Sequence, residues 1–204
     1  MALPRVFWVA LGGAAVLASA AHVQAGYGIF GSYAVLNANG GGNVFYDLSS
    51  TTANPDFNGA DLGTFNPYTG QILLLNGGEV DTYKNSGDDI LGADLFYRIT
   101  PVPGTPGSFT DSTLFWAADL GGGDQKWQAT AANINVLTGR PNGDYHLEIY
   151  TTATYKWPNG TTGPIYANNG GSNYTATFHI VPEPASLGLL GLGLAGLALR
   201  RRHV

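Results

Sequence analysis

The chain has no cysteine, and only 11% of its 204 residues are charged. Without cysteine there can be no disulfide framework, thiolate metal site or cysteine nucleophile. Charged residues make up about 25% of an ordinary globular chain, and solvent-facing helices rely on Glu, Lys, Arg and Gln, so the composition argues against an all-α fold. Glycine is abundant instead, with 30 residues. The apolar fraction of 44% is sufficient for a core and excludes intrinsic disorder.

Residues 1–25 have the features of a secretory signal peptide. Arg5 is followed by a long uncharged run rich in Val, Leu and Ala, and small residues close the segment. We predict cleavage between Ala25 and Gly26, because the residues that follow already have the composition of the exported part. The alternative interpretation is a buried N-terminal helix.

The C-terminal residues form three consecutive parts. Two prolines end any preceding strand, because proline cannot donate to a ladder. Residues 185–199 are uncharged, and at about 1.5 Å per residue they span roughly 22 Å, short of the ~30 Å hydrocarbon core. Basic residues stay cytoplasmic, so a segment that inserts would hold the domain outside. The flanking residues are Pro182, Glu183 and Pro184 on one side and Arg200, Arg201 and Arg202 on the other.

The order of these three parts resembles the PEP-CTERM sorting signal of Gram-negative bacteria, over about residues 181–204. The resemblance implies that the protein is a substrate of exosortase, a membrane-embedded, transpeptidase-like enzyme that cleaves near the Pro-Glu-Pro. It also implies a transient inner-membrane anchor with the domain on the periplasmic side, then release or attachment at the cell surface or in the extracellular matrix. Bacteria with this system commonly make exopolysaccharide. The alternative is a simple C-terminal anchor with no sorting enzyme.

Residues 26–181 make up the exported domain, with residues 182–204 as the sorting signal. The domain contains 13 acidic and five basic side chains, a net formal charge of −8. Because duplex DNA would be repelled, this charge excludes a nucleic-acid partner.

Alternation of apolar and polar residues marks half-buried strands at 94–100, 145–153 and 174–180. Clusters of Gly and Asn, among them Asn76-Gly77-Gly78, are interpreted as hairpin turns. We therefore predict an all-β fold, an antiparallel β-sandwich that is Ig-like or jelly-roll-like. A β-solenoid is the alternative, although the sequence has no fixed repeat period. Shorter predicted strands are 27–36, 43–48, 71–75, 80–84, 113–118, 126–130 and 134–137.

The segment before Tyr145 resembles the approach to a late strand in Ig-like sandwiches, where a loop ends in Gly-x-Tyr. There the tyrosine hydroxyl bonds back to the loop backbone as a tyrosine corner. We predict this structural role for Tyr145, and the local motif transfers no function.

Candidate binding residues are aromatic. An exposed ring can stack on a sugar while polar neighbours hold its hydroxyl groups. Trp127, beside Gln and Lys, and Trp157, in a Pro-Asn-Gly loop, are the candidates for carbohydrate binding. For each of these two rings, packing in the core or as a hydrophobic staple is nevertheless the favoured role, and core packing is also the prediction for Trp116.

Other chemistry has less support. Asp119 and Asp124, with the carbonyls between them, could hold Ca²⁺, although ordinary turn aspartates are the favoured interpretation. No other cofactor is expected. A hydrolase would need two carboxylates across a cleft, and Glu148 is predicted to face solvent on its strand. The two strand histidines, His146 and His179, lie in no catalytic motif.

From the sequence we expect a non-enzymatic protein of the cell surface or extracellular matrix, within exopolysaccharide or a biofilm. A carbohydrate-binding module that uses exposed Trp residues, with or without Ca²⁺, is the alternative. A secreted hydrolase is the least favoured interpretation.

Overall fold

The computed structural model describes residues 26–85 and 87–182. The predicted signal peptide and the residues from Glu183 onward, including the expected membrane segment at 185–199, lie outside this described part. Within it, no helix is both long and apolar enough to cross a bilayer. The elements are β1 (Tyr27–Ala38), β2 (Val44–Asp47), β3 (Asp61–Phe65), the 3-10 helix η1 (Pro67–Thr69), β4 (Leu73–Lys84), β5 (Asp89–Val102), β6 (Thr110–Gly121), β7 (Asp124–Ala129), β8 (Ile134–Asn135), β9 (Gly143–Lys156), β10 (Thr162–Ala167), the 3-10 helix η2 (Asn169–Gly171) and β11 (Tyr174–Ile180).

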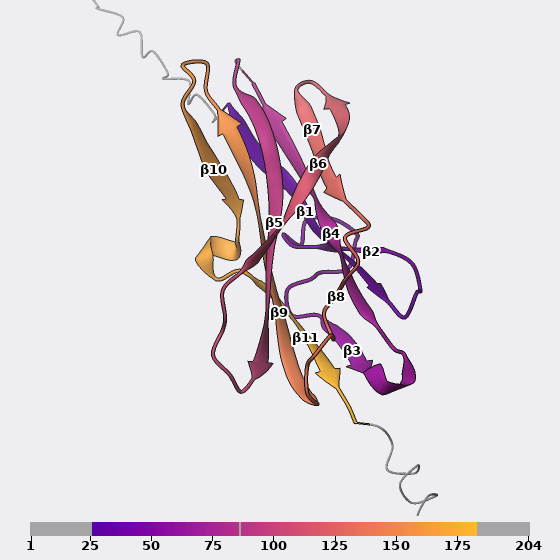
Figure 1. Ribbon diagram of the computed structural model, residues 1–204. Helices are drawn as coiled ribbons and strands as arrows, with labels where there is room; N and C mark the ends of the chain where they lie inside the picture. The colour runs from indigo at the N-terminus through magenta and orange to yellow at the C-terminus, as the bar shows by residue number, and fades with distance from the viewer. Residues whose placement is uncertain (1–25, 86, 183–204) are drawn as a thin grey trace, which may run out of the picture.

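The strands form one hydrogen-bonded path in the order β2-β1-β4-β7-β6-β5-β9-β11-β3, with β8 beside β4 and β10 beside β9 (Figure 1). Strand β6 joins two layers, because residues 110–114 pair with β5 and residues 115–121 pair with β7. The path curls there, so that β1 and β4 of the first layer pack against β5 and β9 of the second. The predicted all-β sandwich is thus confirmed. Its strands pair antiparallel except for β3 and β11, which run parallel.

The core lies between the layers and follows from the alternation along the strands. On β9, Leu147 and Ile149 are fully buried, whereas the intervening Glu148 and Tyr150 belong to the outer surface. One polar contact crosses the core, between the hydroxyl oxygens of Ser32 and Thr151 at 2.6 Å.

Strand β4 corrects one prediction, because residues 71–75 and 80–84 belong to a single strand rather than to two. Gly77 and Gly78 do not form a turn. They lie where the backbone is too close to neighbouring atoms to leave room for a side chain. A Cβ at Gly77, where φ is +119°, would lie 2.5 Å from the carbonyl oxygen of Ala129. A Cβ at Gly78 would lie 2.6 Å from a methyl group of Leu95 in the opposite layer.

Two strands were not predicted. Strand β3 contains Gly63 with φ +107°, and β10 contains Gly163 and Pro164. Both sequences weaken the strand pattern. In β10 the proline is tolerated because this strand pairs only with β9 and lies at an edge.

The tyrosine corner is confirmed. The hydroxyl group of Tyr145 donates to the carbonyl oxygen of Pro141 at 2.7 Å. The ring is 3% exposed and stacks on Phe178 with centroids 5.2 Å apart. Tyr145 therefore fixes the loop before β9 to the core.

The packing at Gly78 gives a stability prediction. We expect Gly78→Ala to lower the free energy of unfolding by about 1–3 kcal/mol, because the new methyl group must displace Leu95 or the carbonyl oxygen of Tyr33, 2.7 Å away. Urea denaturation measures the loss. Gly92→Ala in β5 is the control, since its Cβ would meet nothing within 4 Å. Equal losses in the two variants would contradict this account of the close approach.

Candidate functional site

The outer surface of the second layer carries a group of aromatic side chains, here called the aromatic face. It consists of Phe96 on β5, Tyr150 on β9, Tyr166 on β10, and Phe109 just before β6. The antiparallel register places Phe96 opposite Tyr150 and Tyr166 opposite Thr152. Because alternate residues of these strands enter the core, the aromatic side chains between them must lie outside.

The rings of the aromatic face hold one another in place. Phe96 and Tyr150 stack with centroids 4.7 Å apart and planes 3° from parallel, and Phe109 meets Tyr150 edge-on at 4.8 Å. Tyr166 lies 6.4 Å from Tyr150, tilted by 42°, and is 56% exposed. The stacked pair therefore acts as a support, and Tyr166 is the most exposed of the four rings.

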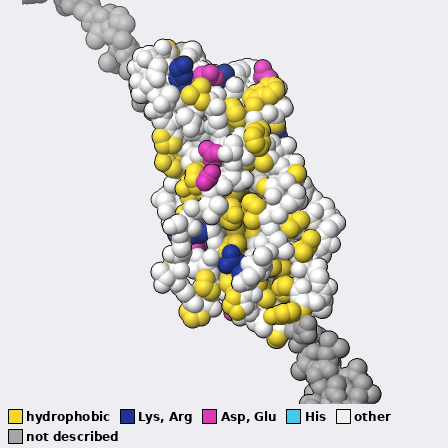
Figure 2. Space-filling view, in the orientation of Figure 1, with side chains coloured by type: hydrophobic (Ala, Val, Ile, Leu, Met, Phe, Trp, Pro, Cys, Tyr) yellow, Lys and Arg dark blue, Asp and Glu magenta, His cyan; other side chains and the backbone are white. Residues whose placement is uncertain are grey.

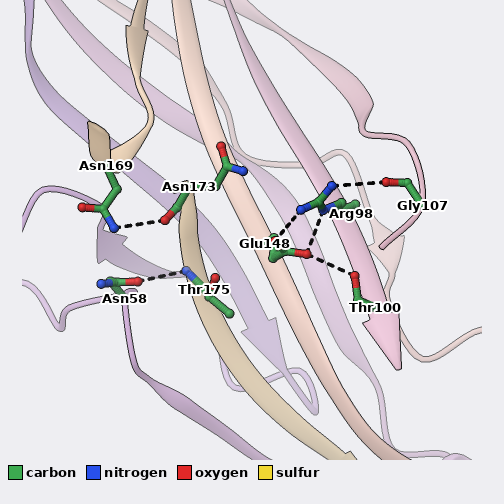
Figure 3. A network of polar contacts seen from close by, with 8 residues as sticks. All are labelled: Asn58, Arg98, Thr100, Gly107, Glu148, Asn169, Asn173 and Thr175. Atoms are coloured by element: carbon green, nitrogen blue, oxygen red, sulfur yellow. Dashed lines mark hydrogen bonds and ion pairs between the residues drawn. The ribbon is translucent and has the colours of Figure 1, made fainter. Parts of the chain in front are cut away.

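An ion pair borders these rings. Arg98 donates through Nε and Nη2 to the two carboxylate oxygens of Glu148, both at 2.7 Å, and Thr100 donates to Oε2 at 3.1 Å (Figure 3). The guanidinium carbon also lies 4.4 Å from the centre of the Phe109 ring. Hydrogen bonds from Arg98 hold the pKa of the Glu148 carboxyl below its ordinary value. The pair therefore stays charged at neutral pH and joins β5 to β9.

Amide groups lie on the other side of Glu148, at the start of β11 (Figure 3). The Asn58 Oδ1 accepts from the backbone of Thr175 at 3.1 Å, and the Asn169 Nδ2 donates to the carbonyl oxygen of Asn173 at 3.1 Å. These bonds shape the loops beside β11. The second layer thus combines an exposed ring, a fixed ion pair and amide groups, the kinds of side chain that hold sugars.

Of the three tryptophans in the described part, one lies in the core and two are exposed. Trp127 is 9% exposed and lies in the core, so its ring has no free face for a sugar. Trp157 is 42% exposed, 6.1 Å from Tyr155, in the loop between β9 and β10. Trp116, predicted to be buried, is 58% exposed because the second half of β6 has left β5. Exposed hydrophobic side chains form a broad band on one side of the molecule (Figure 2).

The acidic candidates lie in the hairpin between β6 and β7. Asp119 accepts a hydrogen bond from the backbone of Gly121 at 2.8 Å, which is the turn role weighed against Ca²⁺ binding. Asp124 begins β7 opposite Gly121. Over residues 26–85 and 87–182, no three His, Asp or Glu side chains group closely enough to hold a metal ion.

The histidines lie on the same outer surface but apart from the rings. His179 on β11 contacts Asp144 through Nδ1 at 2.7 Å, and its Nε2 lies 4.0 Å from Asp61. His146 on β9 is paired with Thr100 and Thr177 in the two ladders.

Two of the buried carboxylates of the first layer lie close together on β4. Glu79 and Asp81 on β4 are 6% and 8% exposed. Lys126 pairs with Glu79 and lies 3.7 Å from Asp81, and Gln128 also donates to Glu79. Burial, and then the charge of Glu79, raise the pKa of the Asp81 carboxyl. Lys126 offsets this repulsion, so the cluster stabilises the pairing of β4 with β7.

Of the predicted processing residues, the described part includes Gly26 and Pro182. Gly26 accepts a hydrogen bond from Asn85 through its carbonyl oxygen, and Pro182 accepts one from the Asn66 side chain at 3.3 Å. Ala25, Glu183, Pro184 and the three terminal arginines lie outside the described residues.

Comparisons with known proteins concern the C-terminal segment and the fold. Residues 181–202 match the family model of the PEP-CTERM protein-sorting motif. No curated protein sequence matches the chain. Among solved structures, the chain is similar to the CooA pilin subunit from enterotoxigenic Escherichia coli, at 9% identity and a TM-score of 0.24. That match covers 72% of this chain and 99% of the pilin chain.

The predicted sorting signal is therefore confirmed. The chain carries a PEP-CTERM motif, which marks an exported protein that is sorted through an exosortase.

The ion pair of the aromatic face predicts a pH-dependent stability. We expect Glu148→Gln to lower the free energy of unfolding at pH 7 by about 1.5–3 kcal/mol, because the neutral amide offers Arg98 one acceptor oxygen in place of two charged ones. A depressed carboxyl pKa stabilises the fold above the unfolded value and loses this effect as the pH falls through the folded value. Denaturation at several pH values should show the wild type and the variant converging below about pH 4. Asp111→Asn, an exposed change on β6, is the control and should cost less than about 0.5 kcal/mol; a pH-independent gap would refute the assignment.

Proposed function

We propose that the protein is a non-enzymatic component of the cell surface or extracellular matrix that binds exopolysaccharide through the aromatic face. The observation that carries the proposal is the exposed ring of Tyr166, supported by the Phe96–Tyr150 stack beside the Arg98–Glu148 pair. This arrangement supplies an apolar ring surface together with polar groups in fixed positions. Sugar recognition needs both, because a pyranose ring has apolar C–H faces and hydroxyl groups at its edge.

The surrounding residues favour a polymer over a small molecule. The aromatic face is formed by parts of four strands or their loops, and its neighbours include the Asn-rich loops at the start of β11. An extended surface with many weak contacts suits repeated sugar units, whose combined avidity replaces a deep pocket.

Trp157 is a second candidate contact. Its neighbour Tyr155 stacks on Tyr27 at 4.1 Å, and both tyrosines pack against the core, so this cluster lies on the opposite side of the β9–β10 hairpin from Tyr166. A polysaccharide that passes the edge strand β10 could meet both exposed rings. Trp157 therefore remains a proposed contact, whereas the buried Trp127 does not.

The proposed sorting determines where the domain would bind polysaccharide. We propose that the C-terminal segment anchors the chain transiently in the inner membrane with the domain on the periplasmic side. Exosortase then removes the Arg-rich tail and delivers the domain to the surface or matrix. In this scheme polysaccharide binding retains the protein after the anchor is lost.

The binding surface can be tested by substitution. We expect Tyr166→Ala to weaken retention on exopolysaccharide purified from the producing bacterium by about 5- to 10-fold, since an aromatic stacking contact is worth about 1 kcal/mol. Affinity electrophoresis measures the retention. Tyr68→Ala is the matched control, because Tyr68 is 63% exposed but lies in η1, away from the aromatic face.

Tyr166→Phe, which keeps the ring, should retain most of the binding. Trp157→Ala tests the second contact separately. Unchanged retention in both Tyr166→Ala and Trp157→Ala would exclude polysaccharide binding by either ring.

The sorting scheme has its own test. In wild-type cells, mass spectrometry of the C terminus should find a protein without Arg200, Arg201 and Arg202 outside the inner membrane. Replacing Pro182, Glu183 and Pro184 by alanine should leave the tail intact and the protein in the inner membrane. An intact wild-type tail in that membrane would instead indicate a simple anchored periplasmic domain.

A further inference from the structure

The folded domain holds the first residue of the sorting motif. Beyond β11, the Val181 N–H donates to the carbonyl oxygen of Phe65 at 3.0 Å, and the Asn66 Nδ2 donates to the carbonyl oxygen of Pro182 at 3.3 Å. The latter carbonyl belongs to the peptide bond that joins Pro182 to Glu183. The point at which the chain enters the rest of the motif is therefore fixed on the domain.

Asn66 is itself held firmly. It is 9% exposed, its backbone N–H donates to the Gln71 side chain at 2.6 Å, and its Oδ1 accepts from the Tyr68 N–H at 3.1 Å. Both polar atoms of the Asn66 side chain are thus hydrogen-bonded: Oδ1 caps η1, and Nδ2 donates to Pro182. A contact held in this way costs little additional side-chain entropy.

A cleft lies beside Asn66, between η1 and the loop that precedes β9. Its volume is about 590 Å³. The Tyr68 ring, 63% exposed, belongs to the η1 wall, and Arg140 belongs to the opposite wall. The cleft thus offers an aromatic ring, prolines and a cation next to the point where the motif begins. Lining residues include Pro67, Tyr68, Gln71, Leu137, Arg140 and Pro141.

Arg140 is oriented but has no acidic partner within residues 26–85 and 87–182. Its Nε donates to the carbonyl oxygen of Val136 at 2.7 Å, and its guanidinium carbon lies 5.8 Å from the centre of the Tyr145 ring. The ion pairs of the described chain do not include it. Lys156, at the other end of β9, also takes part in none of them, so it serves as a matched cation far from the cleft.

We propose that this cleft is an intramolecular docking site for the Pro182-Glu183-Pro184 segment, in which Glu183 pairs with Arg140 and Pro184 packs against Tyr68. Glu183 is the first residue beyond the fixed carbonyl, and its charge complements that of Arg140. A Pro-x-Pro segment is restricted to extended conformations before binding, which is why aromatic grooves bind such segments at low entropic cost.

Docking has a consequence for processing. A protease or transpeptidase must surround the residues it cleaves, and a segment that lies in the cleft is covered on one side by the domain. The docked motif must therefore leave Arg140 before an enzyme can act on it. This part of the inference rests on the proposed sorting scheme, whereas the docking itself does not.

Cross-linking of the full chain in detergent micelles tests the docking, because the native chain has no cysteine. One cysteine replaces Thr138, an exposed residue in the cleft wall, and the other replaces Ala185, just after the motif. We expect a short bifunctional thiol reagent to join Thr138→Cys to Ala185→Cys within one molecule. Adding Arg140→Gln should slow this reaction about two- to five-fold, as expected for a partly exposed ion pair, whereas Lys156→Gln should not change it.

Exchanging the two charges distinguishes loss of the proposed ion pair from a folding defect. Arg140→Glu alone should slow the cross-link at least as much as Arg140→Gln, and adding Glu183→Arg should restore it. Equal rates in the Arg140→Gln and Lys156→Gln variants, or no recovery in the exchanged pair, would overturn the proposal.

In cells, Arg140→Gln should speed removal of the tail relative to wild type and to Lys156→Gln, followed by pulse labelling and mass spectrometry. An unchanged or slower rate would overturn the protective role. If no variant loses its tail, the sorting scheme fails, and the cross-linking result still decides the docking.

Discussion

The two hydrogen-bonded ladders along β9 constrain the rest of the molecule. Strand β5 pairs along one edge from residue 144 to 156, while β11 and β10 share the other edge. A strand held on both edges has only two directions for its side chains, so one set builds the core and the other builds the aromatic face. A slip of one residue would exchange them. Leu147 and Ile149 therefore fix the position of Glu148 and Tyr150, and the order of the proposed binding surface depends on the core beneath it.

Local pattern was sufficient for some of this architecture. Alternation over 145–153 assigned each side chain of β9 to its face, and the Gly-x-Tyr motif identified the Tyr145 corner, because both depend on neighbours in the sequence. The pairing of Phe96 with Tyr150 and of Arg98 with Glu148 joins residues about 50 positions apart, which no local signal specifies. Residue type alone therefore points to the tryptophans and not to the ring cluster, although the alternation identifies the outer faces of both strands.

Some predictions for individual residues are wrong for the same reason, because burial and packing depend on contacts between residues far apart in the sequence. Trp116 and Trp127 lie opposite each other on β6 and β7. Trp127 takes the core position weighed for it, whereas Trp116, predicted to be buried, is exposed. Trp127 is covered by both layers, whereas Trp116 follows the point where β6 leaves β5. Gly77 and Gly78 have the composition of a turn. Their role in close approach to Ala129 and Leu95 depends on how the strands and layers pack, which the local sequence does not specify.

The proposed binding surface and the proposed docking site share no side chain, so their functions are separable by substitution.

The placement of β11 also determines how the domain responds to mechanical load. The described chain begins and ends at opposite ends of the sandwich (Figure 1), and β11 lies between β9 and the parallel strand β3. While the tail is anchored and the domain grips a polymer, tension would run along the axis of β11. Such a pull shears both ladders at once and cannot open them one hydrogen bond at a time. Under the proposed sorting scheme, β11 would therefore resist force directed along the strand toward the C terminus.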